Sequence, residues 1–128
     1  MKNEELYTWS QFDDDCEQVV KWAKDQNFKS VFGIPRGGLI PAVKLSHLLD
    51  IPLVLNLVDV TPNTLVIDDI IDTGATVKRL NFADGVKIAS LYFHEKAETR
   101  PDFFVRVKTK WVRFPWETEN TSRYDNAV

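Results

Sequence analysis

The sequence predicts an α/β fold: one domain with a mainly parallel sheet of four or five strands and helices on both faces. Short apolar runs alternate along the chain with segments of helical periodicity, which is the pattern of strands joined by crossover helices. The run at residues 64–68 is apolar on both faces, as a strand buried inside a parallel sheet must be. A length of 128 residues fits a single domain spanning residues 1–128.

The elements can be placed in order along the chain. The first helix is predicted at about residues 10–26, with Ser10 as N-cap and Asp13, Asp14 and Asp15 in the first turn, where the helix dipole favours anions. A second helix is expected at residues 39–49 and a shorter third one within 74–82. The two ends of the sequence should form a small hood, and residues 118–128 a mobile tail. Strands are predicted at residues 29–34, 51–57, 64–68, 86–93, 102–107 and 111–114.

Composition and charge exclude several classes of protein. The chain is 44% hydrophobic and 27% charged, which is typical of globular domains and not of disordered ones. A net charge of −3 and a pI near 5.3 argue against a nucleic-acid partner. No apolar run approaches the ~18 residues of a membrane span, and no secretory signal is apparent. Because Cys16 is the sole cysteine, no intrachain disulfide can form, and we expect a cytoplasmic protein.

A candidate phosphate site follows the strand at residues 64–68. Asp68 and Asp69 form an acidic pair at the strand end, where they require hydroxyls, a metal or water as partners. The next helix then opens with exposed amides and two hydroxyls, which can cradle a phosphate. An acidic pair beside such a nest suits a ribose phosphate, whereas the simpler alternative is a surface turn capped by Asp72. The nest consists of Thr73, Gly74, Ala75 and Thr76.

A second glycine-bearing segment, residues 33–38, follows the strand at residues 29–34. Arg36 offers a two-pronged donor for phosphate oxygens, and Gly37 comes directly after it. Taken alone, the segment is better explained as a tight turn with a solvated arginine. Both segments lie at carboxyl ends of predicted parallel strands, where α/β sheets bind ligands, so we expect them to converge on one crevice.

These two segments resemble the signature of the type I phosphoribosyltransferase family. Residues 66–76 are similar to the family's motif for phosphoribosyl diphosphate (PRPP), and residues 33–38 to its pyrophosphate loop. The resemblance implies that Arg36 and Gly37 hold the diphosphate, and that residues 73–76 grip the 5′-phosphate. It also implies that Asp68 and Asp69 hold ribose hydroxyls, directly or through Mg²⁺ and its water, with Mg²⁺ as the cofactor. Asp72 would be the general base that accepts the N7 proton of the incoming base.

A third region is similar to the base-binding end of the 6-oxopurine branch, especially the xanthine-guanine enzymes. Residues 92–96 and 110–117 carry this likeness. By position, Lys96 would donate to the purine O6 and Trp111 would stack on the ring. Val112 and Glu117 would supply backbone carbonyls to the base. The alternatives are a solvated Lys96 and a Trp111 packed in the core.

The resemblance spans roughly residues 31–117 and implies purine salvage from PRPP by a homodimer or higher homo-oligomer. The chain departs from the family in three places: only residues 58–63 remain of the long flexible loop, the helix after Thr76 is short, and Arg113 stands where an acid is usual. A non-catalytic PRPP or nucleotide-binding regulatory domain and a phosphoribosyltransferase for another base are therefore alternatives. A receiver-type signalling domain fits less well, because its acidic pair should end the first strand.

Overall fold

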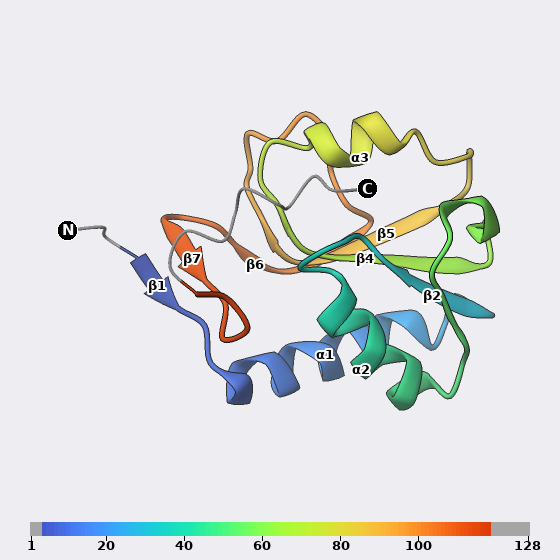
Figure 1. Ribbon diagram of the computed structural model, residues 1–128, viewed down its shortest axis with the longest axis horizontal. Helices are drawn as coiled ribbons and strands as arrows, with labels where there is room; N and C mark the ends of the chain where they lie inside the picture. The colour runs from blue at the N-terminus through green and yellow to red at the C-terminus, as the bar shows by residue number, and fades with distance from the viewer. Residues whose placement is uncertain (1–3, 119–128) are drawn as a thin grey trace.

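A five-stranded parallel sheet forms the centre of the protein, for which a computed structural model describes residues 4–118 (Figure 1). Its strands are β2 (Ser30–Gly33), β3 (Leu53–Val54), β4 (Thr64–Ile71), β5 (Lys87–Phe93) and β6 (Phe103–Val107). They are arranged in the order β3-β2-β4-β5-β6, and every neighbouring pair is parallel. The predicted fold class is confirmed.

The order of the strands creates a crevice between β2 and β4. After β2 the chain passes through helix α2 (Leu39–Leu49) to β3 on one side of the sheet. After β4 it passes through helix α3 (Ala75–Leu80) to β5 on the other side. At such a switch point the two connecting loops diverge, and the space beyond the carboxyl ends of the strands is left for a ligand. These two loops, after β2 and after β4, contain the two glycine-bearing segments that the sequence predicted to bind phosphate.

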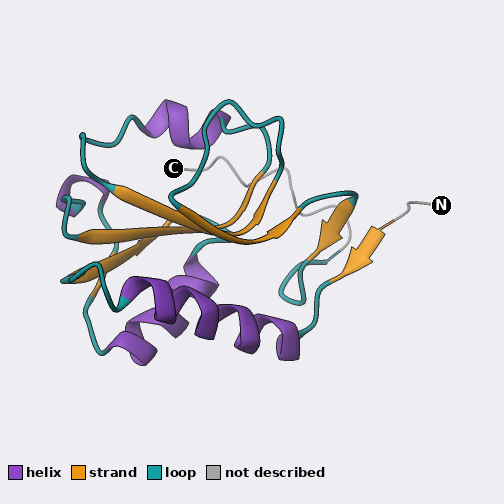
Figure 2. Ribbon diagram, turned by 180° about the vertical axis from the view of Figure 1, so that it is seen from behind, coloured by secondary structure: helices purple, strands orange, loops and turns teal. Residues whose placement is uncertain are grey.

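Helices cover both faces of the sheet. Helix α1 (Trp9–Ala23) and α2 lie on one face and α3 on the other (Figure 2). Alternate residues of β4 serve the two resulting cores: Leu65 and Ile67 pack under α1 and α2, and Val66 packs under α3. All three are fully buried, which explains why this strand is apolar on both faces. Within residues 4–118, no helix combines the length and apolarity needed to cross a membrane.

A separate two-stranded sheet forms the hood. Strand β1 (Glu4–Leu6) pairs in parallel with β7 (Trp111–Arg113), and Glu4 lies opposite Trp111. Arg113 Nη1 also lies 3.7 Å from Glu4 Oε1. The hood is therefore built from both ends of the described chain, although β1 itself was not predicted as a strand, because three residues of Glu-Glu-Leu carry no alternation.

The start of α1 differs from the prediction. Thr8, and not Ser10, is the N-cap: Thr8 Oγ1 accepts a hydrogen bond from the Gln11 amide at 3.1 Å, and Gln11 Oε1 accepts one from the Thr8 amide at 2.9 Å. This reciprocal capping box satisfies two backbone donors at once, which a cap at Ser10 would not. The helix begins earlier in consequence, so the three aspartates fall beyond its first turn, and it ends at Ala23.

Two strand boundaries were also wrong. The strand predicted at residues 51–57 contains only Leu53–Val54, because β3 is an edge strand whose sole partner, β2, is short; a 3-10 turn, Leu57–Asp59, follows. Strand β4 continues to Ile71, beyond the predicted residue 68, since β5 pairs with it as far as Phe93. The acidic pair is thus inside a strand. The tail predicted at residues 118–128 lies outside the described residues except for Thr118.

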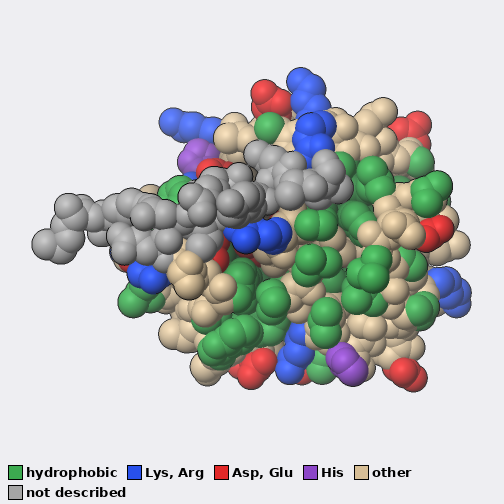
Figure 3. All heavy atoms as spheres, in the orientation of Figure 1, with side chains coloured by type: hydrophobic (Ala, Val, Ile, Leu, Met, Phe, Trp, Pro, Cys, Tyr) green, Lys and Arg blue, Asp and Glu red, His purple; other side chains and the backbone are tan. Residues whose placement is uncertain are grey.

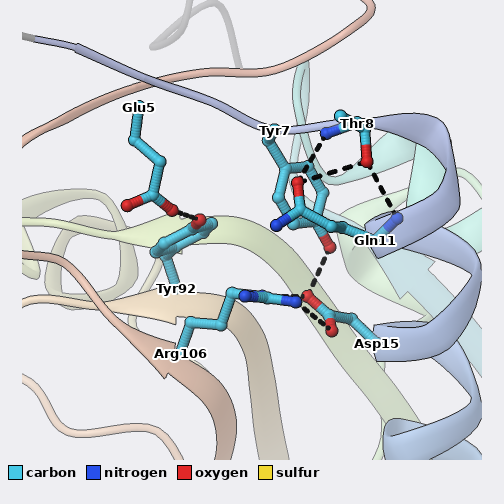
Figure 4. A network of polar contacts seen from close by, with 7 residues as sticks. All are labelled: Glu5, Tyr7, Thr8, Gln11, Asp15, Tyr92 and Arg106. Atoms are coloured by element: carbon cyan, nitrogen blue, oxygen red, sulfur yellow. Dashed lines mark hydrogen bonds and ion pairs between the residues drawn. The ribbon is translucent and has the colours of Figure 1, made fainter.

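A buried carboxylate joins α1, β6 and the hood (Figure 4). Asp15 is only 3% exposed and accepts hydrogen bonds from Arg106 Nε at 2.7 Å, Arg106 Nη2 at 3.1 Å and the Tyr7 hydroxyl at 2.6 Å. Burial, and then the bond to Asp15, raise the pKa of Tyr7, so its hydroxyl remains a donor. A further hydrogen bond, from the Tyr92 hydroxyl to Glu5, fastens β1 to the sheet. The bonds made by the Tyr7 and Tyr92 hydroxyls thus hold the hood in place.

Removal of the Arg106 guanidinium is expected to destabilise the fold strongly. Arg106→Met would leave the Asp15 charge buried with one neutral donor, and breaking such a pair costs about 3 kcal/mol or more. Urea unfolding measures the loss. The matched control is Lys44→Met, which breaks the exposed 3.3 Å ion pair to Asp13 and should cost less than about 1 kcal/mol. Equal losses in the two variants would contradict a structural role for the buried pair.

Candidate active site

A cavity of about 180 Å³ opens at the carboxyl ends of β2 and β4. It lies at the switch point of the sheet, where the order of the strands leaves room for a ligand. The convergence expected from the sequence is therefore found. The sequence-predicted site residues that line this cavity are Arg36, Gly37, Asp68, Asp69, Asp72, Thr73, Gly74, Ala75, Thr76, Trp111, Val112 and Glu117.

The phosphate nest between β4 and α3 is shaped by Gly74. Its φ of 84° lies in the left-handed region, which favours glycine, and it caps α3. A Cβ at this position would lie 2.6 Å from the backbone nitrogen of Thr99, so the loop after β5 can pack directly on the nest. That loop is fixed there by a 2.8 Å bond from the Glu98 amide to the Thr73 carbonyl. The nest is thus closed on its outer side.

The acidic pair is held by the backbone of β4. Asp68 Oδ1 accepts from the Asp69 amide at 2.8 Å, and Asp69 Oδ1 accepts from the Ile70 amide at the same distance. Asp69 is 8% exposed. A Cβ on Gly37 would lie 1.9 Å from Asp69 Oδ2, so only glycine lets the loop after β2 approach this carboxylate. The two predicted phosphate segments therefore lie against each other.

The loop after β2 is anchored to β4 by its backbone. The Ile34 amide donates to the Ile67 carbonyl at 3.0 Å, and the Gly38 amide donates to the Ile34 carbonyl at 2.8 Å. The peptide bond between Pro35 and Arg36 is cis. Arg36 itself is exposed and lines the cavity. A guanidinium with this access can reach an anion that enters from solvent.

The hood supplies the aromatic side of the cavity. Trp111 is 45% exposed, so it is not packed in the core, and it offers the cavity a flat apolar surface. Val112 beside it is buried, and Glu117 Oε1 accepts from the Phe114 amide at 2.8 Å. This hydrogen bond closes the turn after β7 and fixes the backbone there. This geometry suits a planar ring that stacks on Trp111.

The lysine found at the cavity is not the one expected there. Lys96, the predicted contact to the purine O6, is exposed on the loop after β5 and is not among the residues described as lining the cavity. Lys108 lines it instead. Its Nζ lies 2.9 Å from Asp72 Oδ1, and its side chain is 14% exposed. Sequence reasoning missed Lys108, although its place directly after the strand predicted at residues 102–107 was a signal, since ligands bind at such ends.

The donors of the acidic pair fit a magnesium ion. Mg²⁺ prefers oxygen ligands and is bound in many phosphate sites by one or two carboxylates together with substrate oxygens and water. Asp68 and Asp69 offer that set, and both line the cavity. Within residues 4–118, no cluster of three or more His, Cys, Asp and Glu side chains could hold a metal by itself. A magnesium ion here would therefore need oxygens from a bound phosphate compound.

The connection between β3 and β4 is short, as the sequence indicated. It consists of residues 55–63 and contains the 3-10 turn Leu57–Asp59. Val58 in this turn is 87% exposed. No long loop stands between these two strands, so this connection offers no extended segment of the kind that closes over an active site and excludes water.

Comparison with known proteins identifies relatives over most of the chain. No family model matches the sequence. A curated xanthine-guanine phosphoribosyltransferase of Desulfotalea psychrophila is 27% identical over 137 aligned positions, covering 88% of this chain and 86% of that protein. The crystal structure of a purine phosphoribosyltransferase from Pyrococcus horikoshii is 32% identical, with a TM-score of 0.77, and the match covers 90% of this chain and 94% of that one.

A third similarity concerns the fold. The xanthine-guanine-hypoxanthine phosphoribosyltransferase of Helicobacter pylori superposes with a TM-score of 0.79 over 92% of this chain and 95% of that one, at 20% identity.

Proposed function

This chain belongs to the type I phosphoribosyltransferase family, and from that premise we propose that it transfers a phosphoribosyl group from PRPP to a 6-oxopurine base. The products are the nucleoside 5′-monophosphate and pyrophosphate, so the reaction salvages free purines. The candidate bases are hypoxanthine, guanine and xanthine, since all three carry the 6-oxo group. The sole cysteine, buried Cys16, whose pKa is raised to about 12 by burial, suits a reducing cytoplasm.

One observation carries the proposal: a single cavity has a phosphate side and an aromatic side. Arg36, the acidic pair and the nest line one part, and Trp111 lines another. A transferase that joins a ribose phosphate to a planar base needs both at once. A phosphate-binding turn alone would not explain an exposed tryptophan on a separate sheet.

The proposed roles follow from position around the cavity. Arg36 and the amides of its loop hold the diphosphate, and the nest holds the 5′-phosphate. The purine N9 attacks C1′ of the ribose, the bond from C1′ to the diphosphate oxygen breaks, and pyrophosphate leaves. Asp72 accepts the N7 proton of the purine during this step. Its carboxylate is 45% exposed, so it can receive a proton and return it to water.

Magnesium is the proposed cofactor. Asp68 and Asp69 would hold the ion, whose chemistry would be to neutralise the charge of the diphosphate leaving group. The two carboxylates also accept hydrogen bonds from ribose hydroxyls, which orient the sugar.

A substrate panel tests the proposed function. Hypoxanthine, guanine, xanthine, adenine, uracil and orotate are each incubated with PRPP and Mg²⁺, and pyrophosphate release is measured. We expect turnover with at least one 6-oxopurine, slower turnover with adenine, and loss of activity when EDTA removes Mg²⁺.

The panel also distinguishes the alternatives. Fastest turnover with adenine or a pyrimidine would assign the fold to another base. PRPP binding by calorimetry without turnover of any base would indicate a regulatory domain, a reading that the short β3–β4 connection favours.

Asp72→Asn should lower kcat by about 100-fold, since general base catalysis contributes at least that much, and should leave PRPP affinity within about threefold. The amide keeps the shape of the side chain but cannot accept the proton. Steady-state kinetics and calorimetry measure the two effects. Asp84→Asn, an exposed aspartate before β5, is the matched control and should behave as wild type. A kcat unchanged in Asp72→Asn would assign that side chain a structural role only.

We further propose that the protein is a homodimer or higher homo-oligomer. Apolar side chains of α2 and the β3–β4 connection are exposed together, and Figure 3 shows hydrophobic atoms gathered on the face where α2 lies in Figure 1. Apolar side chains gathered on one face often mark interaction sites, and homo-oligomers bury them against a second copy. The residues concerned are Ile40, Val43, Leu48, Leu55, Leu57 and Val58.

A charge placed on this face should weaken the oligomer. Val43→Asp is expected to shift the mass measured by light scattering after gel filtration toward that of the monomer, because a buried charge without a partner is costly. Gln18→Asp adds the same charge to the exposed side of α1 and should leave the mass unchanged. A wild-type mass of 14.8 kDa would contradict the proposal, as would an oligomer unaffected by Val43→Asp.

A further inference from the structure

The hood forms the aromatic side of the cavity, but it is too small to hold itself in position. It consists of β1 and β7, each three residues long, and two strands alone are marginally stable in water at best. The residues that it contributes to the cavity wall include Trp111, Val112 and Phe114. The position of this wall therefore depends on the contacts between the hood and the central sheet.

One of these contacts is the hydrogen bond that the Tyr92 hydroxyl of β5 donates to the Glu5 carboxylate of β1 (Figure 4). Tyr92 is 1% exposed, so loss of this acceptor would leave a buried hydroxyl unpaired, which is costly. Burial, and then the bond to Glu5, raise the pKa of Tyr92, so its hydroxyl remains a donor. Neither Glu5 nor Tyr92 is among the described residues that line the cavity.

The two ends of this hydrogen bond lead to opposite walls of the cavity. Glu5 lies opposite Val112 in the parallel pairing of β1 with β7, and Val112 lines the cavity from the hood. Tyr92 lies opposite Ile70 of β4, which lines the cavity from the sheet. Because paired strands are joined by a ladder of backbone bonds, each wall follows the strand beside it. A single side-chain bond thus ties the hood wall to the sheet wall.

Three aromatic rings surround the bond. Tyr7, Tyr92 and Phe114 pack edge to face, with ring centroids 5.5 Å apart for Tyr7 and Tyr92, 5.3 Å for Tyr7 and Phe114, and 5.9 Å for Tyr92 and Phe114. Phe114 is 2% exposed and lines the cavity. Edge-to-face pairs favour particular ring orientations. A shift of β1 relative to Tyr92 would therefore displace Phe114 as well.

The phosphate side of the cavity does not depend on this bond. The loop after β2 is fixed to β4 by the bond from the Ile34 amide to the Ile67 carbonyl. The nest is fixed to the loop after β5 by the bond from the Glu98 amide to the Thr73 carbonyl. Both bonds lie within the central sheet and its loops, outside the hood. A defect in the hood contact should therefore reach the base and spare the phosphates.

We propose that Glu5 and Tyr92 are positioning residues for the base: their hydrogen bond sets the place of the hood over the sheet, and with it the affinity for the purine. The inference rests on the proposed function, since it concerns the base of that reaction. Small displacements of the groups that hold a reactant are costly, and a shift of about 1 Å can lower a rate about 100-fold. A bond outside the cavity can therefore control binding inside it.

Tyr92→Phe and Glu5→Met test the proposal from the two ends of the bond. We expect KM for the preferred base to rise roughly 10-fold in each variant, while kcat and the Kd for PRPP stay within about threefold of wild type. The double variant should be no worse than the weaker single one, because both changes remove the same bond. Glu5→Gln keeps an acceptor oxygen and should restore most of the affinity. Glu17→Met makes the same change as Glu5→Met at an exposed position of α1 and should behave as wild type.

A binding measurement separates failure of this inference from failure of the proposed function. Calorimetry with inosine 5′-monophosphate and with PRPP needs no turnover, and Tyr92→Phe should weaken the binding of the nucleotide alone. Equal weakening of both ligands, or unchanged binding of the nucleotide, refutes the positioning role. If wild type binds both ligands but turns over no base, the proposed function fails and this comparison still decides the inference.

Two further outcomes have a clear meaning. A wild-type protein that binds neither ligand refutes the inference together with the proposed function. A lower temperature of unfolding in Tyr92→Phe with wild-type affinity for the nucleotide would show that the bond only stabilises the fold, and this also refutes the positioning role. Tyr92→Phe removes a single hydroxyl, so it decides alone if thermal unfolding shows that Glu5→Met is not folded.

Discussion

The arrangement of the site depends on the bonds that the buried Asp15 carboxylate accepts from Arg106 and Tyr7. The sheet alone forms the phosphate side of the cavity, but the aromatic side belongs to a hood with only two short strands. Arg106 of β6 and Tyr7, beside β1, both bind Asp15, so one charge draws α1, the sheet edge and the hood together. A buried carboxylate keeps its partners close because separation would leave it without compensation. Through β1 and β7, this constraint reaches Trp111.

The phosphate side was predictable because its determinants are local in sequence. Because β4 is buried on both faces, its run of apolar residues was enough to predict it as a strand. Helix α2 has the predicted bounds. In each of the two loops a glycine makes the local structure possible: Gly74 adopts a positive φ, and Gly37 leaves space for the Asp69 carboxylate. Their meeting follows from the rule that parallel strands share one carboxyl edge. Few long-range contacts had to be known.

The base side was less predictable because it depends on contacts between distant segments. Nothing near Lys96 in sequence shows that its loop packs on Gly74, and nothing near Lys108 shows that Asp72 lies 2.9 Å away. The pairing of β1 with β7 has no local signal either. The error at Ser10 is of another kind: Thr8, two residues earlier, caps the helix through its reciprocal bonds with Gln11, and the pattern of apolar residues does not report such bonds.

The parallel pairing of β1 with β7 has a consequence for the order in which the parts of the protein fold. Glu4 pairs with Trp111, and all the strands of the central sheet lie between these two residues in the sequence. Contacts of such long sequence separation form late, because the intervening chain must first be ordered. The phosphate-binding surface, which needs the sheet alone, can therefore form in a folding intermediate whose base-binding surface, which needs the two ends of the described chain to pair, is still absent.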